Sequence, residues 1–206
     1  MNLHMQILNY LEGYMICTGL LTGEKVRLTA IDERDIPIIS SWYSDADFLR
    51  YFDKVPAIPK SIKQIDEWIN AIQSSNNTCP FAIRDINNGE MVGYIELGSI
   101  QWWNGTATMG IGIGTNAERG KGYGKEALKL LLDFAFKELN LHRVQLNVFS
   151  YNQKAINLYE KLGFKHEGTY REFIHRDGKR WDMYLYGILE NEWSEISNNL
   201  GKISKH

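Results

Sequence analysis

The chain has 206 residues, of which 44% are hydrophobic and 23% are charged, as in an ordinary globular domain and unlike a disordered or fibrous protein. Its 23 basic and 25 acidic side chains give a formal net charge of −2, so no overall positive field would attract nucleic acid. No apolar run approaches the roughly 20 residues that cross a bilayer, which argues against a membrane protein.

The cysteines and histidines indicate neither disulfides nor a metal. Cys17 and Cys79 cannot form a disulfide framework, and the five histidines show no pair at ligand spacing. We therefore expect a soluble, cytosolic, metal-free protein. Residues 1–23 are interpreted as an N-terminal appendage and not as a secretory signal, because they lack a cationic start and a cleavage pattern. Without repeats or linkers, the rest predicts one α/β domain over residues 24–195 and a polar tail over 196–206.

The first part of the domain predicts one strand and two helices. Lys25–Ala30 alternates as a strand does, and Asp32–Asp35 supplies acidic residues for the start of a helix. Ser61 and Gln64 match a capping box ahead of a second helix. The apolar residues at helical spacing are Ile36, Ile39, Trp42 and Tyr43 in the first helix and Ile65, Trp68, Ile69 and Ile72 in the second.

Beyond the second helix the apolar period changes to two, which predicts strands. Phe81–Asp85 and Met91–Leu97 flank Asn87–Gly89, and Asn-Gly is a strong signal for a hairpin turn. A further strand is predicted over Thr106–Ile113, after a loop that carries Trp102 and Trp103.

The last part predicts alternating helices and strands. Lys121–Leu139 has the pattern of a long amphipathic helix, and Val144–Val148 that of the strand after it. Asn152 is expected to cap a helix that runs to Leu162 and ends at Gly163. The final predicted hairpin has strands over Thr169–Ile174 and Trp181–Leu189.

A glycine-rich stretch before the long helix is the first candidate site. Gly110 and Gly112 lie on one face of the preceding strand, and glycine in a strand often marks the close approach of a ligand. The loop Arg119–Gly124 then opens onto the helix, where converging amide groups and the helix N-terminus can bind an anion. Lys121 and Lys125 add positive charge. The alternative interpretation is a flexible glycine loop that binds no ligand.

Two nucleotide-binding patterns are weaker alternatives. The chain has no G-x-x-x-x-G-K-[ST] run, which excludes a Walker loop. Gly122–Ala127 matches a loose G-x-G-x-x-A dinucleotide fingerprint, but that fingerprint requires an acidic residue about 20 positions onward. His142 and Arg143 occupy that region, which weakens the case for a nicotinamide-dependent oxidoreductase.

The second candidate site is Asn152–Phe164, a helical segment with Tyr159 on its apolar face. Taken alone, this spacing favours a core aromatic residue. The two stretches together resemble the GNAT superfamily of N-acetyltransferases. The R-x-x-G-x-G loop is Arg119–Gly124, and N-x-x-A-x-x-L-Y-E-K-x-G-F is matched at each fixed position of the second stretch. Thr169–Trp181 resembles the RimJ/RimL-like and spermidine/spermine acetyltransferase branch.

The resemblance covers about Lys25 to Trp193 and implies both a fold and a reaction. The implied fold is α/β (α+β), with a central mixed, mostly antiparallel sheet of about six to seven strands flanked by about four helices. The implied reaction is acetyl transfer from acetyl-CoA to a primary amine by direct attack in a ternary complex, without a covalent enzyme intermediate and without a metal.

The resemblance also implies roles for individual residues. The backbone of Ile111, Gly112 and Ile113 would pair with the pantetheine arm like an added strand, and an N–H of Ile111 or Gly112 would stabilise the oxyanion. Asn152 would contact the cofactor arm, and Tyr159 would protonate the departing thiolate. The amides that would hold the pyrophosphate are those of Arg119, Gly120, Lys121, Gly122, Tyr123, Gly124 and Lys125.

The general base departs from the resemblance. Many relatives carry a glutamate in the glycine-side strand at the position where this chain has Met109. Our substitute candidate is Glu96 in the neighbouring strand, on the face that we expect it to share with Val92 and Tyr94. A glutamate without a catalytic duty, or attack by amines already deprotonated in solution, are the alternatives.

The acceptor pocket is expected around the two predicted helices and the Trp102–Trp103 loop. Acids and aromatics there suit a cationic amine through ion pairing and cation–π contact. The sequence does not choose among a protein N-terminus, a polyamine and a small amine or antibiotic as the acceptor. It also does not decide whether the protein forms a homodimer. The rival to an enzyme is a catalytically silent acyl-CoA-binding sensor. The residues that mix acids with aromatics are Asp45, Phe48, Tyr51, Phe52 and Asp53.

Overall fold

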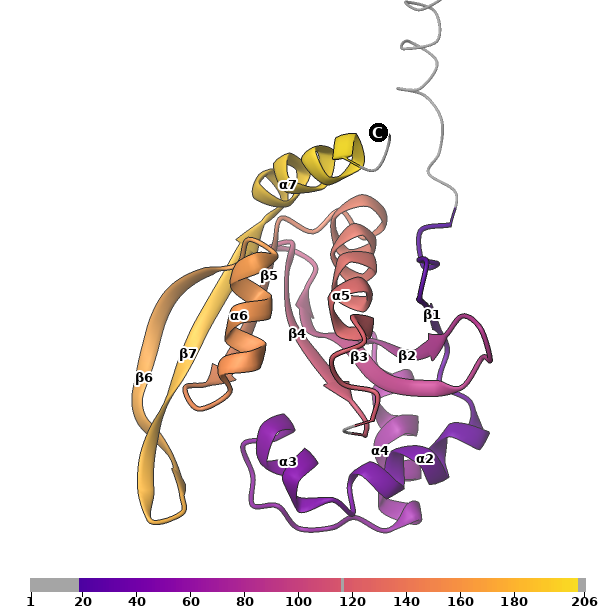
Figure 1. Cartoon of the computed structure of the whole chain (residues 1–206), viewed down its shortest axis with the longest axis vertical. Coiled ribbons are helices and arrows are strands. Elements are labelled where there is room, and N and C mark those ends of the chain that lie inside the picture. The colour runs from indigo at the N-terminus through magenta and orange to yellow at the C-terminus, as the bar shows by residue number, and fades with distance from the viewer. Residues whose placement is uncertain (1–18, 116, 204–206) are drawn as a thin grey trace, which may run out of the picture.

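A seven-stranded sheet in the order β1-β2-β3-β4-β5-β7-β6 forms the centre of the computed structural model, which describes residues 19–115 and 117–203 (Figure 1). The β4–β5 pair is parallel and the other neighbours are antiparallel, which confirms the mixed, mostly antiparallel sheet. The strands are β1 (Val26–Thr29), β2 (Cys79–Asp85), β3 (Met91–Gln101), β4 (Thr106–Ile113), β5 (Arg143–Phe149), β6 (Lys165–Arg176) and β7 (Lys179–Leu189).

Helices cover both faces of the sheet. The helices α2 (Ile36–Trp42), α3 (Ala46–Phe52) and α4 (Ile62–Gln73) lie on one face, and α5 (Tyr123–Asp133) and α6 (Gln153–Lys161) lie on the other. A last helix, α7 (Glu190–Ile203), follows β7. The described part of the chain therefore has two more helices than the four expected, namely α3 and α7. None of its helices is long and apolar enough to cross a membrane.

The local signals in the sequence form the expected turns and caps. The Ser61 hydroxyl accepts from the backbone N–H of Gln64, and the Gln64 side chain accepts from the backbone N–H of Ser61. Asn152 Oδ1 accepts from the N–H of Ala155 at 3.3 Å and so caps α6. Gly163 ends that helix with a φ of +92°, a left-handed conformation that favours glycine.

The long helix expected over Lys121–Leu139 is shorter and differs at both ends. It begins at Tyr123 because Gly122, its N-cap, has a left-handed backbone with a φ of +92°. It ends at Asp133 and continues as a π-helical turn, η2 (Phe134–Glu138). The N–H of Leu139 donates to the carbonyl of Phe134 at 3.1 Å, five residues back, which is the hydrogen bond of a π-turn.

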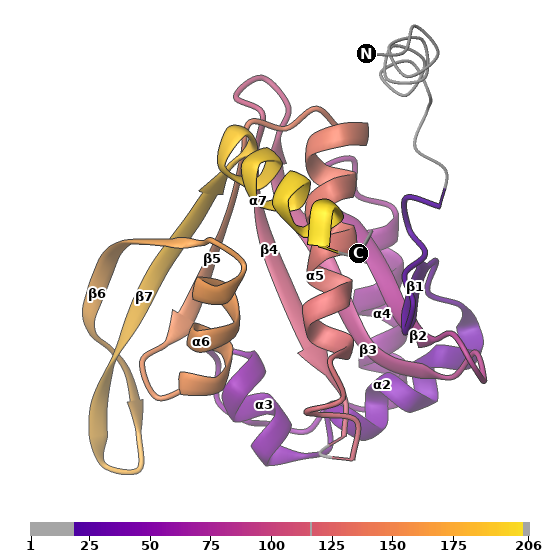
Figure 2. The same ribbon diagram turned by 45° about the horizontal axis from the view of Figure 1, so that its top comes forward.

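The C-terminal residues expected to form a polar tail are helical through Ile203. Trp193 is only 2% exposed, and its indole N–H donates to Asp133 at the end of α5 at 2.8 Å. Ile196, three residues later, packs against the main core. Figure 2 shows α7 against this end of α5. Trp193 and Ile196 stand among polar residues, so this contact is hard to recognise in the sequence.

Each face of the sheet has its own hydrophobic core, and a smaller cluster of Phe149, Ile174 and Met183 lies toward the β6–β7 hairpin. The larger core lies under α5 and α6, and the smaller core lies under α2, α3 and α4. A bulge at Val92 interrupts the alternation of β3, since Ile83 pairs with Gly93 but Arg84 pairs with Met91. Val92 therefore packs in the larger core, while Tyr94 packs in the smaller one.

Candidate active site

The parallel strands β4 and β5 pair along only part of their length. Pairing runs from Thr106 with Arg143 to Thr108 with Gln145 and then stops. Beyond that point β4 continues to Ile113, and its β5-facing edge has no strand partner within the described residues. The peptide groups of Ile111–Ile113, the segment singled out in the sequence, lie on this open edge. An extended ligand can therefore hydrogen-bond there as an added strand does.

The glycine loop lies at the end of the same strand, where α5 begins. Arg119 Nε donates to the carbonyl of Ile113 at 3.3 Å, which ties the loop to the end of β4. Gly120 and Gly122 have φ values of +83° and +92°, so both positions require the left-handed conformation. A Cβ on Gly124 would lie 3.6 Å from Ile113, so this residue packs beside the open edge. Amide groups of such a loop, together with the N-terminus of a helix, can bind an anion.

The electrostatics of this loop depend on residues that the sequence pattern missed. Lys121 pairs with Glu118 at 3.0 Å, which offsets part of its charge, and Lys125 is exposed. Lys25, just before β1, places its Nζ 3.0 Å from the carbonyl of Lys121 and so brings a cation to the loop. Glu126 holds that segment in place by accepting from the backbone N–H groups of Glu24, Lys25 and Val26. About 100 residues separate these partners, so no local pattern could indicate them.

Tyr123, the first residue of α5, anchors the helix to the sheet. It is buried, and its hydroxyl donates to Asp85 at the end of β2. This hydrogen bond and burial raise the pKa of Tyr123 to about 12, and the same bond lowers the pKa of Asp85. The side chain of Tyr123 therefore stabilises the fold, and only its backbone N–H is a candidate for binding an anion in the loop.

Glu96 lies directly across from Gly110 in the β3–β4 pairing, and Tyr94 lies across from Gly112. A Cβ on Gly110 would lie 3.6 Å from Glu96 Oε1, an ordinary contact distance, so the carboxyl group lies beside this glycine. Burial raises the pKa of Glu96, although the hydrogen bond from the Tyr94 hydroxyl opposes that rise. The expected neighbour Tyr94 shares its face, whereas Val92 does not, because of the bulge in β3.

An aromatic wall continues from Glu96 to α3. Phe52 covers Gly112 so closely that a Cβ there would lie 2.8 Å from the Phe52 ring. The ring centroid of Phe52 is 6.0 Å from that of Tyr43 and 6.4 Å from that of Tyr94. Burial raises the pKa of Tyr43, and the charges of Asp53 and Glu96 add to that rise. The wall thus has two nearby carboxyl groups.

The ammonium group of Lys60 lies over the aromatic rings at one side of this wall. Lys60 Nζ lies 4.8 Å from the centroid of the Tyr43 ring and 5.9 Å from that of Trp68. Cation–π attraction of this kind favours a positive charge over the face of an aromatic ring. The surface can therefore hold an amine in its charged form.

Tyr159 lies on the other face of the sheet, in the main core under α6. Its ring centroid is 5.8 Å from that of Phe164, and burial raises its pKa to about 12. Its hydroxyl has no hydrogen-bond partner in the described part of the chain. Tyr159 and Glu96 thus lie on opposite faces of the sheet.

Two sequence expectations about this region are corrected. The Trp102–Trp103 loop lies at the start of β4, the end of the strand opposite to Gly112 and Ile113, and so it does not line the same site. Trp102 instead donates from its indole to the carbonyl of Asn76 at 2.9 Å. Phe48 and Phe52 belong to α3, a helix that the sequence did not predict and that brings them over β4.

Known proteins are similar in sequence to most of this chain. The model of the acetyltransferase (GNAT) domain matches residues 25–165. An uncharacterized N-acetyltransferase from the SPbeta prophage of Bacillus subtilis, YokL, is 34% identical over 84% of this chain and 94% of its own. The spermidine N(1)-acetyltransferase of Vibrio cholerae is 27% identical over 83% of this chain and 96% of its own.

The fold agrees with that sequence match. A crystal structure of spermidine N-acetyltransferase from Vibrio cholerae, in complex with CoA and spermine, superposes with a TM-score of 0.75 at 27% identity, covering 83% of this chain and 99% of that one. The branch expected from the sequence is therefore confirmed, and the oxidoreductase alternative is set aside. The protein is an N-acetyltransferase by its domain and its relatives. A domain match over more than half of the chain, on a sheet that opens between β4 and β5, shows that this chain belongs to the GNAT family of acetyltransferases.

Proposed function

We propose that the open edge of β4 and the glycine loop together hold acetyl-CoA. The cofactor supplies the thioester whose acetyl group is transferred. The peptide groups of Ile111–Ile113 would bind its pantetheine arm, because they lie on the edge that β5 leaves unpaired. The amides from Arg119 to Lys125 would hold the pyrophosphate, with Lys25 as an additional cation. Asn152, at the start of α6, would contact the arm from the other side of the gap.

Glu96 is the proposed general base. An ammonium group cannot attack a thioester, since its nitrogen has no free electron pair, so one proton must leave before the C–N bond forms. Glu96 lies across from Gly110, on the face of the aromatic wall that would bind the amine. Its raised pKa makes it a stronger base than an ordinary glutamate. As the C–N bond forms and the C–S bond breaks, an N–H of Ile111 or Gly112 would stabilise the oxyanion.

Tyr159 is the proposed hydrogen-bond donor to the departing thiolate, the role that its raised pKa allows in place of full proton transfer. It lies in the main core on the α6 face of the sheet, so that proton removal by Glu96 and the hydrogen bond from Tyr159 would come from opposite faces. Because its hydroxyl keeps its proton up to about pH 12, it can donate a hydrogen bond throughout the physiological range.

The acceptor proposed here is a primary amine that is cationic in solution. The single observation that carries this proposal is the aromatic wall of Tyr43, Phe52 and Tyr94, flanked by the carboxyl groups of Asp53 and Glu96. The name of the Vibrio relative, which acts on spermidine, supports the same amine class. We also propose that residues 24–195 together with α7 form the catalytic domain, and that the protein is cytoplasmic and forms a homodimer.

The test is turnover on a panel of amines. Purified protein is mixed with acetyl-CoA and each amine, free CoA thiol is measured over time, and the acetylated product is identified by mass spectrometry. We expect thiol release that depends on the amine, and strong loss of that release in Glu96→Gln. Tight CoA binding with no turnover on any amine would instead identify a silent acyl-CoA sensor.

A further inference from the structure

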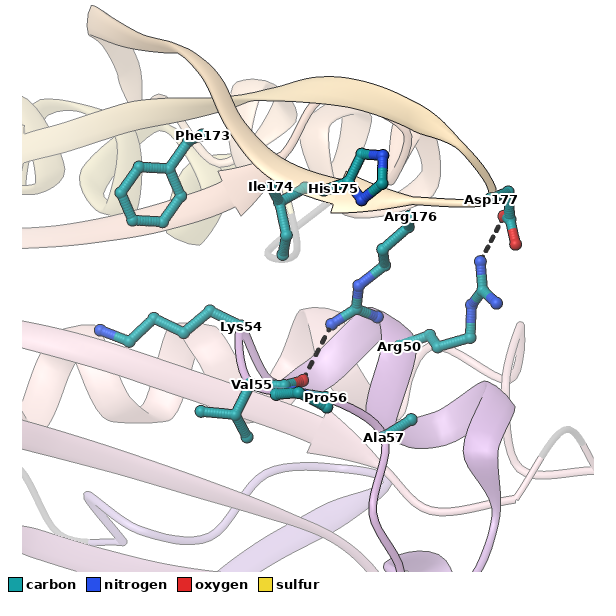
Figure 3. A pocket seen from close by; sticks show the side chains of 10 residues that line it. All are labelled: Arg50, Lys54, Val55, Pro56, Ala57, Phe173, Ile174, His175, Arg176 and Asp177. Atoms are coloured by element: carbon teal, nitrogen blue, oxygen red, sulfur yellow. Dashed lines mark hydrogen bonds and ion pairs between the residues drawn. The ribbon is translucent and has the colours of Figure 1, made fainter.

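A cavity of about 350 Å³ lies between the loop after α3 and the tip of the β6–β7 hairpin (Figure 3). It is next to the proposed amine site, because Asp53 follows Phe52 directly, and Arg176 Nη2 donates to the carbonyl of Asp53 at 2.6 Å. The residues around it are Arg50, Lys54, Val55, Pro56, Ala57, Phe173, Ile174, His175, Arg176 and Asp177.

The charge of this cavity is positive. Three cationic side chains line it against one carboxylate, that of Asp177, which pairs with Arg50. Lys54 and Arg176 have no acidic partner within the described residues. The net positive character contrasts with the overall charge of the chain, which is −2.

Two hydrogen bonds hold the guanidinium of Arg176 in place, but one of its nitrogen atoms has no hydrogen-bond partner among the described residues. Its Nη2 donates to the carbonyls of Asp53 and Val55, and its guanidinium lies 5.5 Å from the centre of the Phe149 ring at the end of β5. Its Nη1 is buried and has no hydrogen-bond partner among the described residues. A buried guanidinium N–H without an acceptor is costly, and a carboxylate can accept from it strongly.

Asp53 separates two environments of opposite charge. Its carboxylate acts on Tyr43 in the aromatic wall, whereas its carbonyl accepts from Arg176 at the cavity. An acceptor that carries both an amine and an acid could place the amine toward Asp53 and Glu96 and the acid toward Arg176 and Lys54. A polyamine would instead bring a second positive charge toward these two cations, which is unfavourable.

We propose that this cavity binds a carboxylate of the acceptor, so that the preferred substrates are amines that also carry an acid group. The proposal rests on the proposed acetyltransferase function and specifies its substrate class. Arg176 and Lys54 would be the anion-binding residues, and Phe173 and Val55 would contact the carbon chain between the two charged ends.

The test compares three matched acceptors of the same chain length: an ω-amino acid, its amide and the corresponding diamine, over a series of lengths. We expect kcat/KM for the acid to exceed that for the amide about 10-fold at the best length, through KM rather than kcat. Lys54→Gln and Arg176→Gln should each reduce that acid-to-amide ratio. Lys179→Gln, on the same hairpin but outside the cavity, is the matched control and should keep the ratio.

Binding of the products provides a measurement that does not need turnover. With CoA present, calorimetry compares the N-acetylated acid with the N-acetylated amide, and we expect the acid to bind about 10-fold tighter. Equal binding, a preference for the diamine, or a ratio that survives in both variants would overturn the anion site. If no amine is acetylated but the acid product still binds tighter, the proposed chemistry fails while the anion site stands.

Discussion

Tyr159→Phe separates catalysis from packing at the one helix residue for which the sequence allowed both roles. The ring lies in the main core and contacts Phe164, and Phe preserves that ring. The hydroxyl donates no hydrogen bond to any described residue, so its removal breaks no internal contact. We therefore expect the free energy of unfolding to change by less than about 1 kcal/mol.

The expected loss of turnover follows from the pKa of this phenol. With a pKa raised to about 12 by burial, Tyr159 is a weaker acid than a thiol, whose pKa is about 8.5, so complete proton transfer to the thiolate is uphill. Its contribution is then that of a hydrogen bond to a developing negative charge, about 1.5–3 kcal/mol. Loss of that bond should lower kcat about 10- to 100-fold.

The pH dependence sharpens the test. Because Tyr159 stays protonated below about pH 11, the parent and Tyr159→Phe should show the same pH profile, displaced only in height. The assay is single-turnover acetyl transfer at saturating acetyl-CoA, so that chemistry and not product release is measured. Equal single-turnover rates across this range would refute the hydrogen bond to the thiolate and leave Tyr159 as a core aromatic.

A matched variant controls for the loss of a tyrosine hydroxyl. Tyr186 in β7 is also buried, and its hydroxyl donates to Glu160 at 2.8 Å, outside the proposed site. Tyr186→Phe should lower the free energy of unfolding by about 0.5–1.5 kcal/mol and keep the rate of acetyl transfer. We therefore expect Tyr159→Phe to lose activity and keep its stability, and Tyr186→Phe to lose stability and keep its activity.

Three further outcomes are expected. Glu96→Gln should lower kcat/KM about 100-fold or more and remove the acid limb of the pH profile. Because burial raises the pKa of Glu96, that limb in the parent should lie above the usual range of a glutamate. An acid limb that is unchanged in the variant would assign it to another group. Gly122→Val should weaken CoA binding in a protein that stays folded by circular dichroism, because the position has a φ of +92° and a Cβ there would lie 3.1 Å from Lys25 Nζ. Gly120→Ala also replaces a glycine of positive φ but has open space around it, so it should weaken CoA binding less. Equal losses of CoA affinity would contradict the argument from crowding. A chain truncated after residue 195 loses the contact of Ile196 with the main core and should melt at a lower temperature than one truncated after residue 203, as differential scanning fluorimetry can measure; identical melting would show that this part of α7 does not stabilise the fold.

The sequence alone determined the features that depend on neighbouring residues. The capping box at Ser61, the turn at Gly89 and the end of α6 at Gly163 each follow from the conformational preferences of a few adjacent residues, and all three form as predicted. The glycine loop and the Asn152–Phe164 segment were likewise recognisable, because the residue types at fixed short spacing carry the family signature. Alternation of apolar residues was enough to place β4 and β5.

Only the tertiary structure decided which of these features meet. The bulge at Val92 changes which residues share a face with Glu96, and a register shift of this kind depends on the pairing of β3 with β2. The contact of Lys25 with the glycine loop and the hydrogen bond from Trp193 to Asp133 join residues far apart in the chain. Such contacts arise when strands and helices pack together, so they leave no periodic signal. The opening between β4 and β5 is of the same kind, because strand divergence is a property of the whole sheet and not of either strand.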